Sequence, residues 1–145
     1  MRGVKIRRAR AGDAARIAEL SGQLGYPVPA REIAGRLKRV MKDRDAACFV
    51  AEDAGEIAGW VHVSVTDLLE VVRRAEINGL VVEEKTRSRG TGKYLLEAAE
   101  NWARGQKCKT VSVRSNVLRE RAHGFYERNG YECYKVQKAF TKKMK

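Results

Sequence analysis

The sequence predicts an α/β protein in which a mixed sheet carries helices on both faces. Two kinds of pattern indicate this class: apolar residues that alternate with polar ones, as in strands, and apolar residues at helical spacing. Along the chain the segments follow the order strand, two helices, three strands, helix, strand, helix and two strands. That order is typical of one sheet covered by helices. No repeat or low-complexity linker interrupts it, so we expect a single domain over residues 1–145.

The N-terminal part is predicted as one strand followed by two helices. Val4–Arg8 alternates apolar and basic residues, and Asp13 is a suitable N-cap for the helix that follows. This helix ends at residues 25–29, because the prolines there lack a backbone donor and restrict their neighbours. The second helix has an apolar face formed by Ile33, Leu37, Val40 and Met41.

The middle of the chain is predicted as a hairpin and a further strand. Ala47–Ala51 and Glu56–Val65 flank a turn at Asp53–Gly55, and Arg74–Val82 is the next strand. In the second arm of the hairpin, we expect His62 to be an ordinary half-buried polar residue.

The C-terminal part is predicted to alternate between helices and strands. The helix that begins near residue 90 ends near Gly105. A strand at Lys109–Arg114 follows, and then a helix over residues 118–128. Tyr131–Tyr134 and Val136–Phe140 are predicted as the closing strands.

The composition describes a globular protein without a membrane helix. The chain has 145 residues, of which 43% are hydrophobic and 33% charged, and no apolar run approaches the roughly 20 residues that a span needs. The three cysteines are far apart and lack metal-ligand spacing. We therefore expect them to be small buried side chains, with no bound metal and a reducing, cytoplasmic setting.

The formal net charge of +12 comes from the ends of the chain. Residues 1–10 hold five basic side chains, residues 135–145 hold five lysines, and neither stretch holds an acid. A basic chain attracts polyanions, so a non-catalytic module that binds nucleic acid or a partner through its basic termini stays open as a second function class. Aromatic residues do not interleave with the basic ones as in single-strand platforms, so nucleic acid is not the expected partner.

The segment at residues 80–93 carries the strongest functional signal. A β-branched strand end passes through a charged turn with two glycines, Gly90 and Gly92, into a helix. Such a turn presents bare backbone N–H groups and the positive end of a helix to an anion. The Walker pattern fails, because Arg87 replaces its first glycine and Tyr94 follows its lysine, and the dinucleotide pattern lacks its third glycine. The remaining pattern, R-x-x-G-x-G, fits a phosphate-binding turn, with an ordinary glycine-containing helix start as the alternative.

Residues 76–100, which include this turn, resemble the acetyl-CoA-binding motif of the GNAT superfamily of N-acetyltransferases. Residues 116–131 resemble that family's second motif, in which an Asn follows the fifth strand and an A-x-x-F-Y helix ends in N-G-[FY]. The resemblance implies a mixed, mainly antiparallel sheet of six to seven strands with about four helices on its faces, in which strands four and five splay apart to admit coenzyme A. It also implies an acetyl-CoA-dependent N-acetyltransferase, with acetyl-CoA as co-substrate, and is compatible with a homodimer.

The resemblance assigns most of the site residues to cofactor binding. The strand end would pair with the pantetheine arm, the turn would hold the pyrophosphate, and the N–H near Val82 would polarise the thioester carbonyl. Asn116 would contact the pantetheine, and Tyr126 would protonate the departing thiolate. The cofactor-binding residues implied in this way are Leu80, Val81, Val82, Arg87, Ser88, Arg89, Gly90, Thr91, Gly92, Lys93, Asn116 and Tyr126.

Two side chains are expected to move protons. An alkylamine with a pKa near 10 is only about 0.1% deprotonated at pH 7, so a base has to remove a proton. Glu76 is the candidate, because strand alternation places it on the side of Leu80 and Val82, although a bulge would change this parity. An ion pair with an arginine is the alternative role for Glu76, and packing against the cofactor is the alternative for Tyr126.

The acceptor is expected to be a primary amine, and the sequence indicates its nature only loosely. Specificity should come from residues 21–40, from the hairpin around 64–72 and from the C-terminal strands. Gln23–Pro27 and the second motif are similar to small bacterial acetyltransferases of aminoalkylphosphonates and related small amines, which favours a small molecule. A protein N-terminus or lysine stays open as the acceptor. A polycationic acceptor would need acidic side chains, and those placed to provide them are Glu32, Asp67, Glu70 and Glu76.

Overall fold

The computed structural model describes residues 3–86, 89–115 and 117–145 of the chain. The chain divides into two compact units, at residues 1–113 and 114–145. Over the described residues, the first unit contains a sheet with three α-helices, and the second contains one α-helix and an extended tail. The expectation of a single domain stays a prediction.

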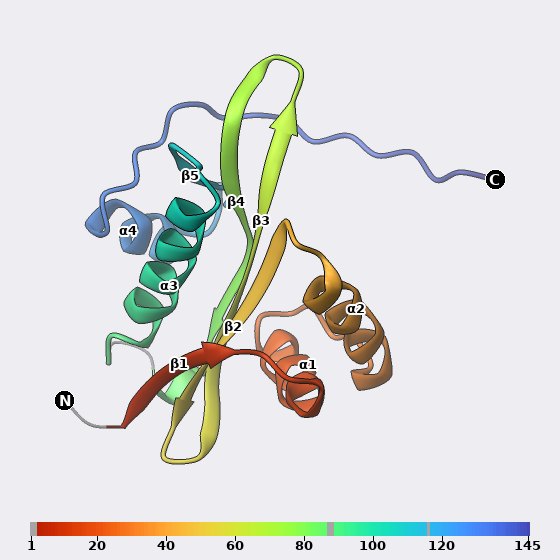
Figure 1. Ribbon diagram of the computed structural model, residues 1–145, viewed down its shortest axis with the longest axis vertical. Coiled ribbons are helices and arrows are strands. Elements are labelled where there is room, and N and C mark those ends of the chain that lie inside the picture. Colours follow the sequence, from red (N-terminus) through yellow and green to blue (C-terminus); the bar gives the residue numbers. More distant parts are fainter. Residues whose placement is uncertain (1–2, 87–88, 116) are drawn as a thin grey trace. The chain divides into compact units, whose positions relative to one another are not determined.

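The first unit is built on a mixed sheet with the strand order β1-β2-β3-β4-β5 (Figure 1). Neighbouring strands up to β4 are antiparallel, whereas β5 pairs parallel with β4 over residues 75–77. A mainly antiparallel mixed sheet is thus confirmed, but the described residues form five strands and do not confirm the expected six to seven. These strands are β1 (Val4–Arg8), β2 (Ala46–Asp53), β3 (Glu56–Leu68), β4 (Val71–Val82) and β5 (Val111–Val113).

Helices cover both faces of this sheet, as predicted. Helices α1 (Ala14–Gln23) and α2 (Ala30–Lys42) lie against one face, and α3 (Thr91–Gly105) lies against the other (Figure 1). Burying each large aliphatic side chain contributes roughly 1.5–3 kcal/mol, so these two interfaces hold the unit together. The largest fully buried side chains are Leu20, Leu95, Leu96, Val50, Val61, Val63 and Thr91.

Asp13 precedes α1 but does not cap it with its side chain. Its carboxylate accepts hydrogen bonds from the Arg7 guanidinium at 2.9 Å and from the backbone N–H of Arg10 at 2.7 Å. Burial raises the pKa of Asp13, but these hydrogen bonds outweigh it and hold that pKa below its ordinary value. The residue therefore ties β1 to the 3₁₀ turn η1 (Ala11–Asp13) that leads into the helix.

A bulge in β4 changes which residues share a face. His62 pairs with Gly79, but the next residue of β3, Val63, pairs with Ile77, so Asn78 is an extra residue in β4. The predicted grouping of Glu76 with Leu80 and Val82 is therefore wrong. Directly opposite residues of an antiparallel pair lie on the same face.

Ser64 lies opposite Glu76 and therefore shares its face. Trp60 lies opposite Val81, and both belong to the core under α1 and α2. Since Trp60 and Ser64 are on the same side of β3, Glu76 faces the α1 and α2 side of the sheet. Gly79 fits beneath the indole of Trp60, because an added Cβ there would come within 2.7 Å of the ring.

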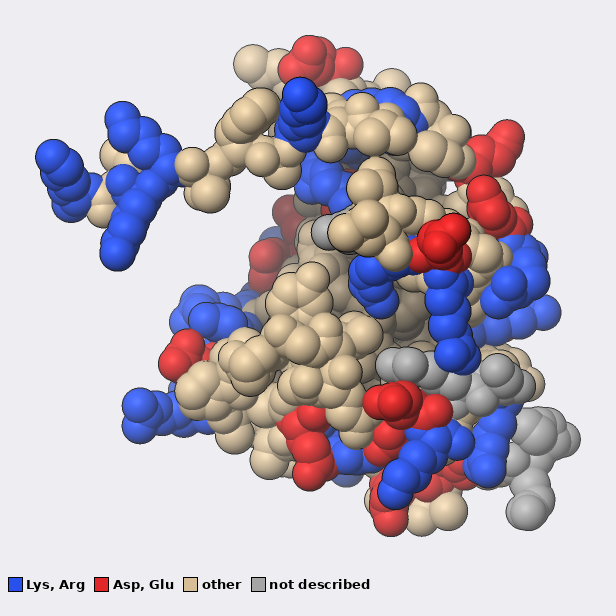
Figure 2. All heavy atoms as spheres, turned by 180° about the vertical axis from the view of Figure 1, so that it is seen from behind, with Lys and Arg blue, Asp and Glu red and all other residues tan. Residues whose placement is uncertain are grey.

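The second unit contains α4 (Glu120–Arg128) and a tail without strands. The helix starts two residues later than predicted. The expected strands at Tyr131–Tyr134 and Val136–Phe140 are not formed: a strand needs a neighbouring strand in a sheet, and the five strands of the described residues end with β5 at Val113. Lysines gather at the end of the tail, whereas basic and acidic side chains are interspersed elsewhere on the face shown in Figure 2. Among the described residues, no helix is both long and apolar enough to span a membrane.

Candidate active site

The predicted strand, turn and helix at residues 80–93 are present in the structure. β4 ends at Val82, a short 3₁₀ turn η2 (Glu84–Thr86) follows, and α3 begins at Thr91. β5 pairs with β4 only as far as Ile77, so the described parallel ladder stops before the strand end at residues 80–82. Arg87 and Ser88, two of the predicted phosphate-binding residues, lie outside the described residues.

Gly90 allows the chain to enter α3 directly from the turn. Its φ of 86° and ψ of 0° are in the left-handed region, where a residue with a Cβ is strained. The first helical hydrogen bond runs from the N–H of Tyr94 to the carbonyl of Gly90 at 3.0 Å. The N–H groups of Thr91, Gly92 and Lys93 therefore precede the helical ladder and point out of the helix end.

The side chains around this helix end fit an anionic ligand. Thr91 is 1% exposed, and its hydroxyl oxygen Oγ1 has no hydrogen-bond partner among the described residues. Arg89 and Lys93 are exposed and add positive charge at the turn. Bare N–H groups, an orphaned hydroxyl and two cations are the chemistry that a pyrophosphate requires.

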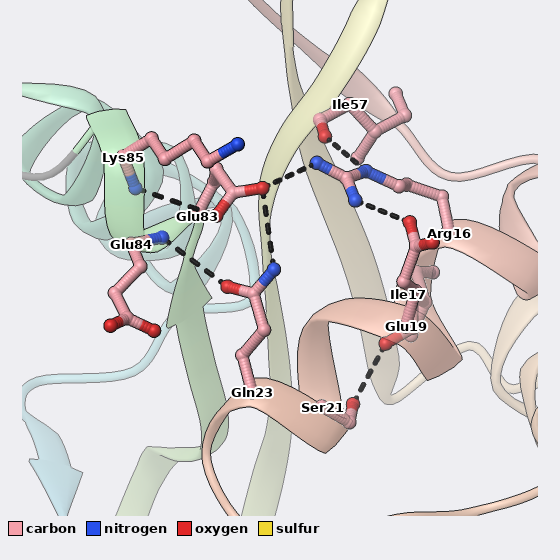
Figure 3. A network of polar contacts seen from close by, with 9 residues as sticks. All are labelled: Arg16, Ile17, Glu19, Ser21, Gln23, Ile57, Glu83, Glu84 and Lys85. Atoms are coloured by element: carbon pink, nitrogen blue, oxygen red, sulfur yellow. Dashed lines mark hydrogen bonds and ion pairs between the residues drawn. The ribbon is translucent and has the colours of Figure 1, made fainter.

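Glu83 anchors the turn to α1 through a network that sequence reasoning missed (Figure 3). The guanidinium Nη2 of Arg16 donates to Glu83 Oε1 at 2.9 Å, and the amide of Gln23 donates to the same oxygen at 3.3 Å. In return, the backbone N–H of Glu84 donates to the Gln23 side-chain oxygen at 3.3 Å. The hydrogen bond from Arg16 is the main reason why the pKa of Glu83 lies below its ordinary value.

The same network continues into the sheet. Arg16 Nε donates to the carbonyl of Ile57 at 2.9 Å, and the N–H of Glu83 donates to the carbonyl of Ala58 at 2.7 Å. The only sequence signal for these contacts is that Arg16 and Gln23, seven residues apart, share one face of α1. The partner 67 residues away could not be inferred from that spacing.

Glu76 is buried in the middle of β4, which runs from Val71 to Val82. It is 7% exposed, and its Oε1 lies 3.8 Å from Nη2 of Arg74. The arginine pairing considered as an alternative is therefore present. Its neighbour across the strands, Ser64, accepts a hydrogen bond from the Asn78 side-chain amide at 2.8 Å, so the bulge residue is itself fixed.

A hollow of about 380 Å³ adjoins Ser64 on the α2 side of the sheet. Residues of α2 and of β3 contribute to it, and His62 is half-buried in its wall. Burial lowers the pKa of His62, partly opposed by the charge of Asp43, so the imidazole is mainly neutral at pH 7. The residues that line the hollow are Arg36, Arg39, Val40, Asp43, Ala46, His62 and Ser64.

Tyr126, the predicted general acid, belongs to α4 in the second unit. Its ring makes edge contacts with Phe125 at 5.2 Å and with Tyr131 at 5.8 Å between centroids. Burial raises the pKa of the Tyr126 hydroxyl, and the charge of Arg119 only partly opposes this. Asn116, predicted to contact the pantetheine arm, lies outside the described residues. No three His, Cys, Asp or Glu side chains of the described chain gather as metal ligands.

The chain is similar to several known proteins. It is 32% identical over 134 residues to the uncharacterized N-acetyltransferase YhfO of Bacillus subtilis (strain 168), covering 89% of this chain and 90% of the relative. A GNAT family acetyltransferase from Staphylococcus aureus has the same fold, with a TM-score of 0.76 and 22% identity over 99% of this chain and 100% of that one. The aminoglycoside N-acetyltransferase AAC(6')-Iy, solved with CoA, superposes with a TM-score of 0.88 at 18% identity, over 97% of this chain and 95% of that one.

The family model for the acetyltransferase (GNAT) family matches residues 16–131, which include most of α1, the whole sheet after β1 and the turn at residues 80–93. The match spans both predicted motifs and most of the chain. The resemblance read from the two motifs is thereby confirmed. The chain belongs to the GNAT family of acetyltransferases and is an acyltransferase.

Proposed function

We propose that this enzyme transfers an acetyl group from acetyl-CoA to the primary amine of a small molecule, by direct attack in a ternary complex. The observation that carries the proposal is the turn before α3. Its left-handed Gly90, its orphaned Thr91 hydroxyl and its outward N–H groups suit a pyrophosphate. Acetyl-CoA supplies the acyl group as an activated thioester.

The donor side of the site would lie along the end of β4 and the start of α3. The backbone of residues 80–82 would pair with the pantetheine arm, in a gap where β4 and β5 splay apart. The short β4–β5 ladder, which ends at Ile77, supports this arrangement. A main-chain N–H near Val82 would stabilise the negative charge that develops on the thioester oxygen. The turn at residues 87–93 would hold the pyrophosphate.

Glu76 is proposed as the base that takes a proton from the acceptor amine, directly or through water. Its burial and its place beside the hollow at Ser64 support this role. The neighbouring Arg74 places a positive charge 3.8 Å from Glu76 Oε1. As the amine nitrogen bonds to the carbonyl carbon, the C–S bond breaks and coenzyme A leaves as a thiolate.

Tyr126 is proposed as the acid that returns a proton to this thiolate. A tyrosine with a pKa near 10 loses about 2 kcal/mol on giving its proton to a thiolate with a pKa near 8.5 in water. Since burial raises the pKa of Tyr126 further, the hydroxyl stays protonated at pH 7. It would release its proton only to a thiolate whose charge is also destabilised by burial.

The direct test is Tyr126→Phe, assayed by release of the free coenzyme A thiol over a panel of amines. Loss of a general acid should lower kcat about 10²- to 10⁴-fold. The affinity for acetyl-CoA, measured by calorimetry, should stay nearly intact. Tyr134→Phe is the control, because Tyr134 is exposed in the tail. Normal turnover in Tyr126→Phe would contradict the proposed role of Tyr126 as general acid.

The alternative function, a non-catalytic module that binds through its basic termini, leads to different expected results. It would bind DNA or RNA tightly and with steep salt dependence, and binding would weaken when residues 1–10 and 135–145 lose their charge. Acetyl-CoA would then give no heat of binding. The calorimetric titration therefore separates the two function classes before any acceptor is known.

A further inference from the structure

Acetylation of an ammonium ion removes two protons from its nitrogen, and the site described so far offers one base, Glu76. An alkylamine with a pKa near 10 is almost entirely an ammonium ion at pH 7. Its nitrogen loses one proton before it can attack and a second as it becomes an amide, whereas the sulfur of coenzyme A takes up only one. If Glu76 accepts a proton from the attacking amine, the earlier proton of the ammonium ion needs an acceptor of its own.

The imidazole of His62 is a neutral base in the wall of the hollow. His62 is half-buried and lines the hollow together with Ser64, two residues further along β3. Among the described residues, burial and then the charge of Asp43 act on its pKa, and no hydrogen bond engages its ring nitrogens. Since burial keeps the imidazole mainly neutral at pH 7, a ring nitrogen is available to accept a proton.

The pairing of β3 with β4 places His62 near Glu76 on one face of the sheet. Glu76 does not line the hollow itself, but it lies directly opposite Ser64, which does. His62 is two residues from Ser64 on the same side of β3, so it is a diagonal neighbour of Glu76. Diagonal neighbours in an antiparallel pair are about 7–8 Å apart, so both side chains can reach the same amine nitrogen.

The groups packed around His62 leave its imidazole as the stronger base. Opposite it lie Cys48 of β2, whose thiol stays neutral because burial raises its pKa to about 12, and Gly79 of β4, which has no side chain. A carboxylate is a weaker base than a neutral imidazole, and a guanidinium group cannot accept a proton. The charged residues of α2 that line the hollow are Arg36, Arg39 and Asp43, and Arg36 is paired with Glu32.

We propose that His62 takes the first proton from the bound ammonium ion and that Glu76 takes the second as the C–N bond forms. The C–S bond breaks, and the thiolate receives the proton of Tyr126. Of the two protons from nitrogen, one replaces the proton lost by Tyr126, and the other leaves to water through the partly exposed imidazole. The enzyme can then use the abundant ammonium form of its acceptor. This inference rests on the proposed function and adds a residue to its acceptor side.

The first experiment compares His62→Gln with the wild type on two amines, by thiol release at saturating acetyl-CoA. Propylamine is an ammonium ion at pH 7, whereas the fluorines of trifluoroethylamine keep its amine neutral. We expect kcat/KM for propylamine to fall about 10- to 10³-fold, the limit being set by the small fraction of free amine. Trifluoroethylamine should stay within about twofold and serves as the control for folding. Another ammonium ion of the panel replaces propylamine where the wild type turns it over faster.

The second experiment follows the pH dependence, which a purely structural role of His62 would not change. The loss in His62→Gln should shrink as the pH rises toward about 10, because the free amine then becomes abundant. In the wild type, kcat/KM for propylamine should fall in acid as the imidazole becomes protonated. Asp43→Asn should move this fall to lower pH, because it removes the charge that raises the pKa of His62.

The outcomes separate this inference from the function beneath it. Equal losses for both amines in His62→Gln overturn the inference, because the residue would then support the fold rather than accept a proton. Unchanged turnover of propylamine overturns it as well and leaves an N-acetyltransferase that takes up the free amine. A fall in acid that does not move in Asp43→Asn belongs to another group and also overturns it. Binding of acetyl-CoA with no thiol release for any amine of the panel contradicts the proposed function itself.

Discussion

The C-terminal end of β4 and its middle are held by different kinds of contact. At the C-terminal end, Glu83 contacts α1 through Arg16 and Gln23 and contacts β3 through its own backbone N–H. In the middle of the strand, Glu76 and Ile77 pair with both β3 and β5, and the side chain of the bulge residue Asn78 donates a hydrogen bond to Ser64, which lines the hollow. The strand end is thus fixed by contacts to α1 and β3, whereas the middle is fixed within the sheet and borders the hollow.

This difference matches the two ligands that the strand would serve. A preformed set of N–H groups at the strand end suits the pyrophosphate of the proposed donor, because a rigid turn loses little entropy on binding. The proposed acceptor would instead meet a few side chains near the middle of the strand. The comparison therefore predicts that changes near Glu83 alter donor affinity, and that changes at Glu76 alter turnover.

The largest effect is expected in the middle of β4, for Glu76→Gln. Loss of a general base should lower kcat about 10²- to 10⁴-fold, whereas the affinity for acetyl-CoA should change little. Calorimetry and thiol release on the same preparation measure the two quantities. Glu97→Gln, which removes an exposed carboxylate from α3, is the control. A weakened affinity for acetyl-CoA with intact kcat would mean that Glu76 serves the donor rather than the acceptor.

Gly90→Ala tests the turn between the end of β4 and α3. A Cβ at a φ of 86° costs about 1–2 kcal/mol, so the turn should distort and the affinity for acetyl-CoA should fall about five- to thirtyfold. Gly105→Ala is the matched control, since nothing lies within 4 Å of a Cβ added there and its φ is not positive. Equal affinities in both variants would show that the left-handed turn is not needed for the donor.

Arg16→Ala should have a smaller effect at the same end. It removes the contacts to Glu83 and to the Ile57 carbonyl, together worth about 1–2 kcal/mol, part of which would appear as looser binding of acetyl-CoA. We expect the dissociation constant to rise about three- to tenfold, with kcat at saturation nearly unchanged. Arg31→Ala removes an exposed arginine from α2 as the control. Arg16→Glu combined with Glu83→Arg should restore part of the affinity, which simple damage to α1 would not allow.

The same comparison explains what the sequence could predict. The turn was predictable because its signals are local: a strand end, Gly90, and a helix that follows at once. The contact between Arg16 and Glu83 was not predictable, because the two residues are 67 positions apart and either side chain could have faced water. The face of Glu76 was predicted wrongly, since one extra residue, Asn78, reverses the alternation of a strand. The strands expected after α4 failed for a related reason: alternation describes a surface, but a strand also needs a partner.

The smallest expected effect is a pH dependence of the stability that the Arg16–Glu83 contact contributes. The hydrogen bond from Arg16, followed by smaller contributions from Gln23 and the N–H of Lys85, lowers the pKa of Glu83 in the folded protein, although burial opposes this. A carboxyl group whose folded pKa lies below the unfolded value of about 4.3 stabilises the fold fully above that value. The contribution is lost as the pH falls from there through the lowered folded pKa.

The melting temperatures of the wild type and of Glu83→Gln should therefore differ by a constant amount from pH 5 to 8. The gap should narrow below about pH 4.3, where the wild type loses the charge that the variant never had. The contribution is expected to be no more than about 1 kcal/mol, because the pair is partly solvated. A gap that widens in acid would mean that Glu83 is held in its protonated form, and the bracing role of its carboxylate would have to be abandoned.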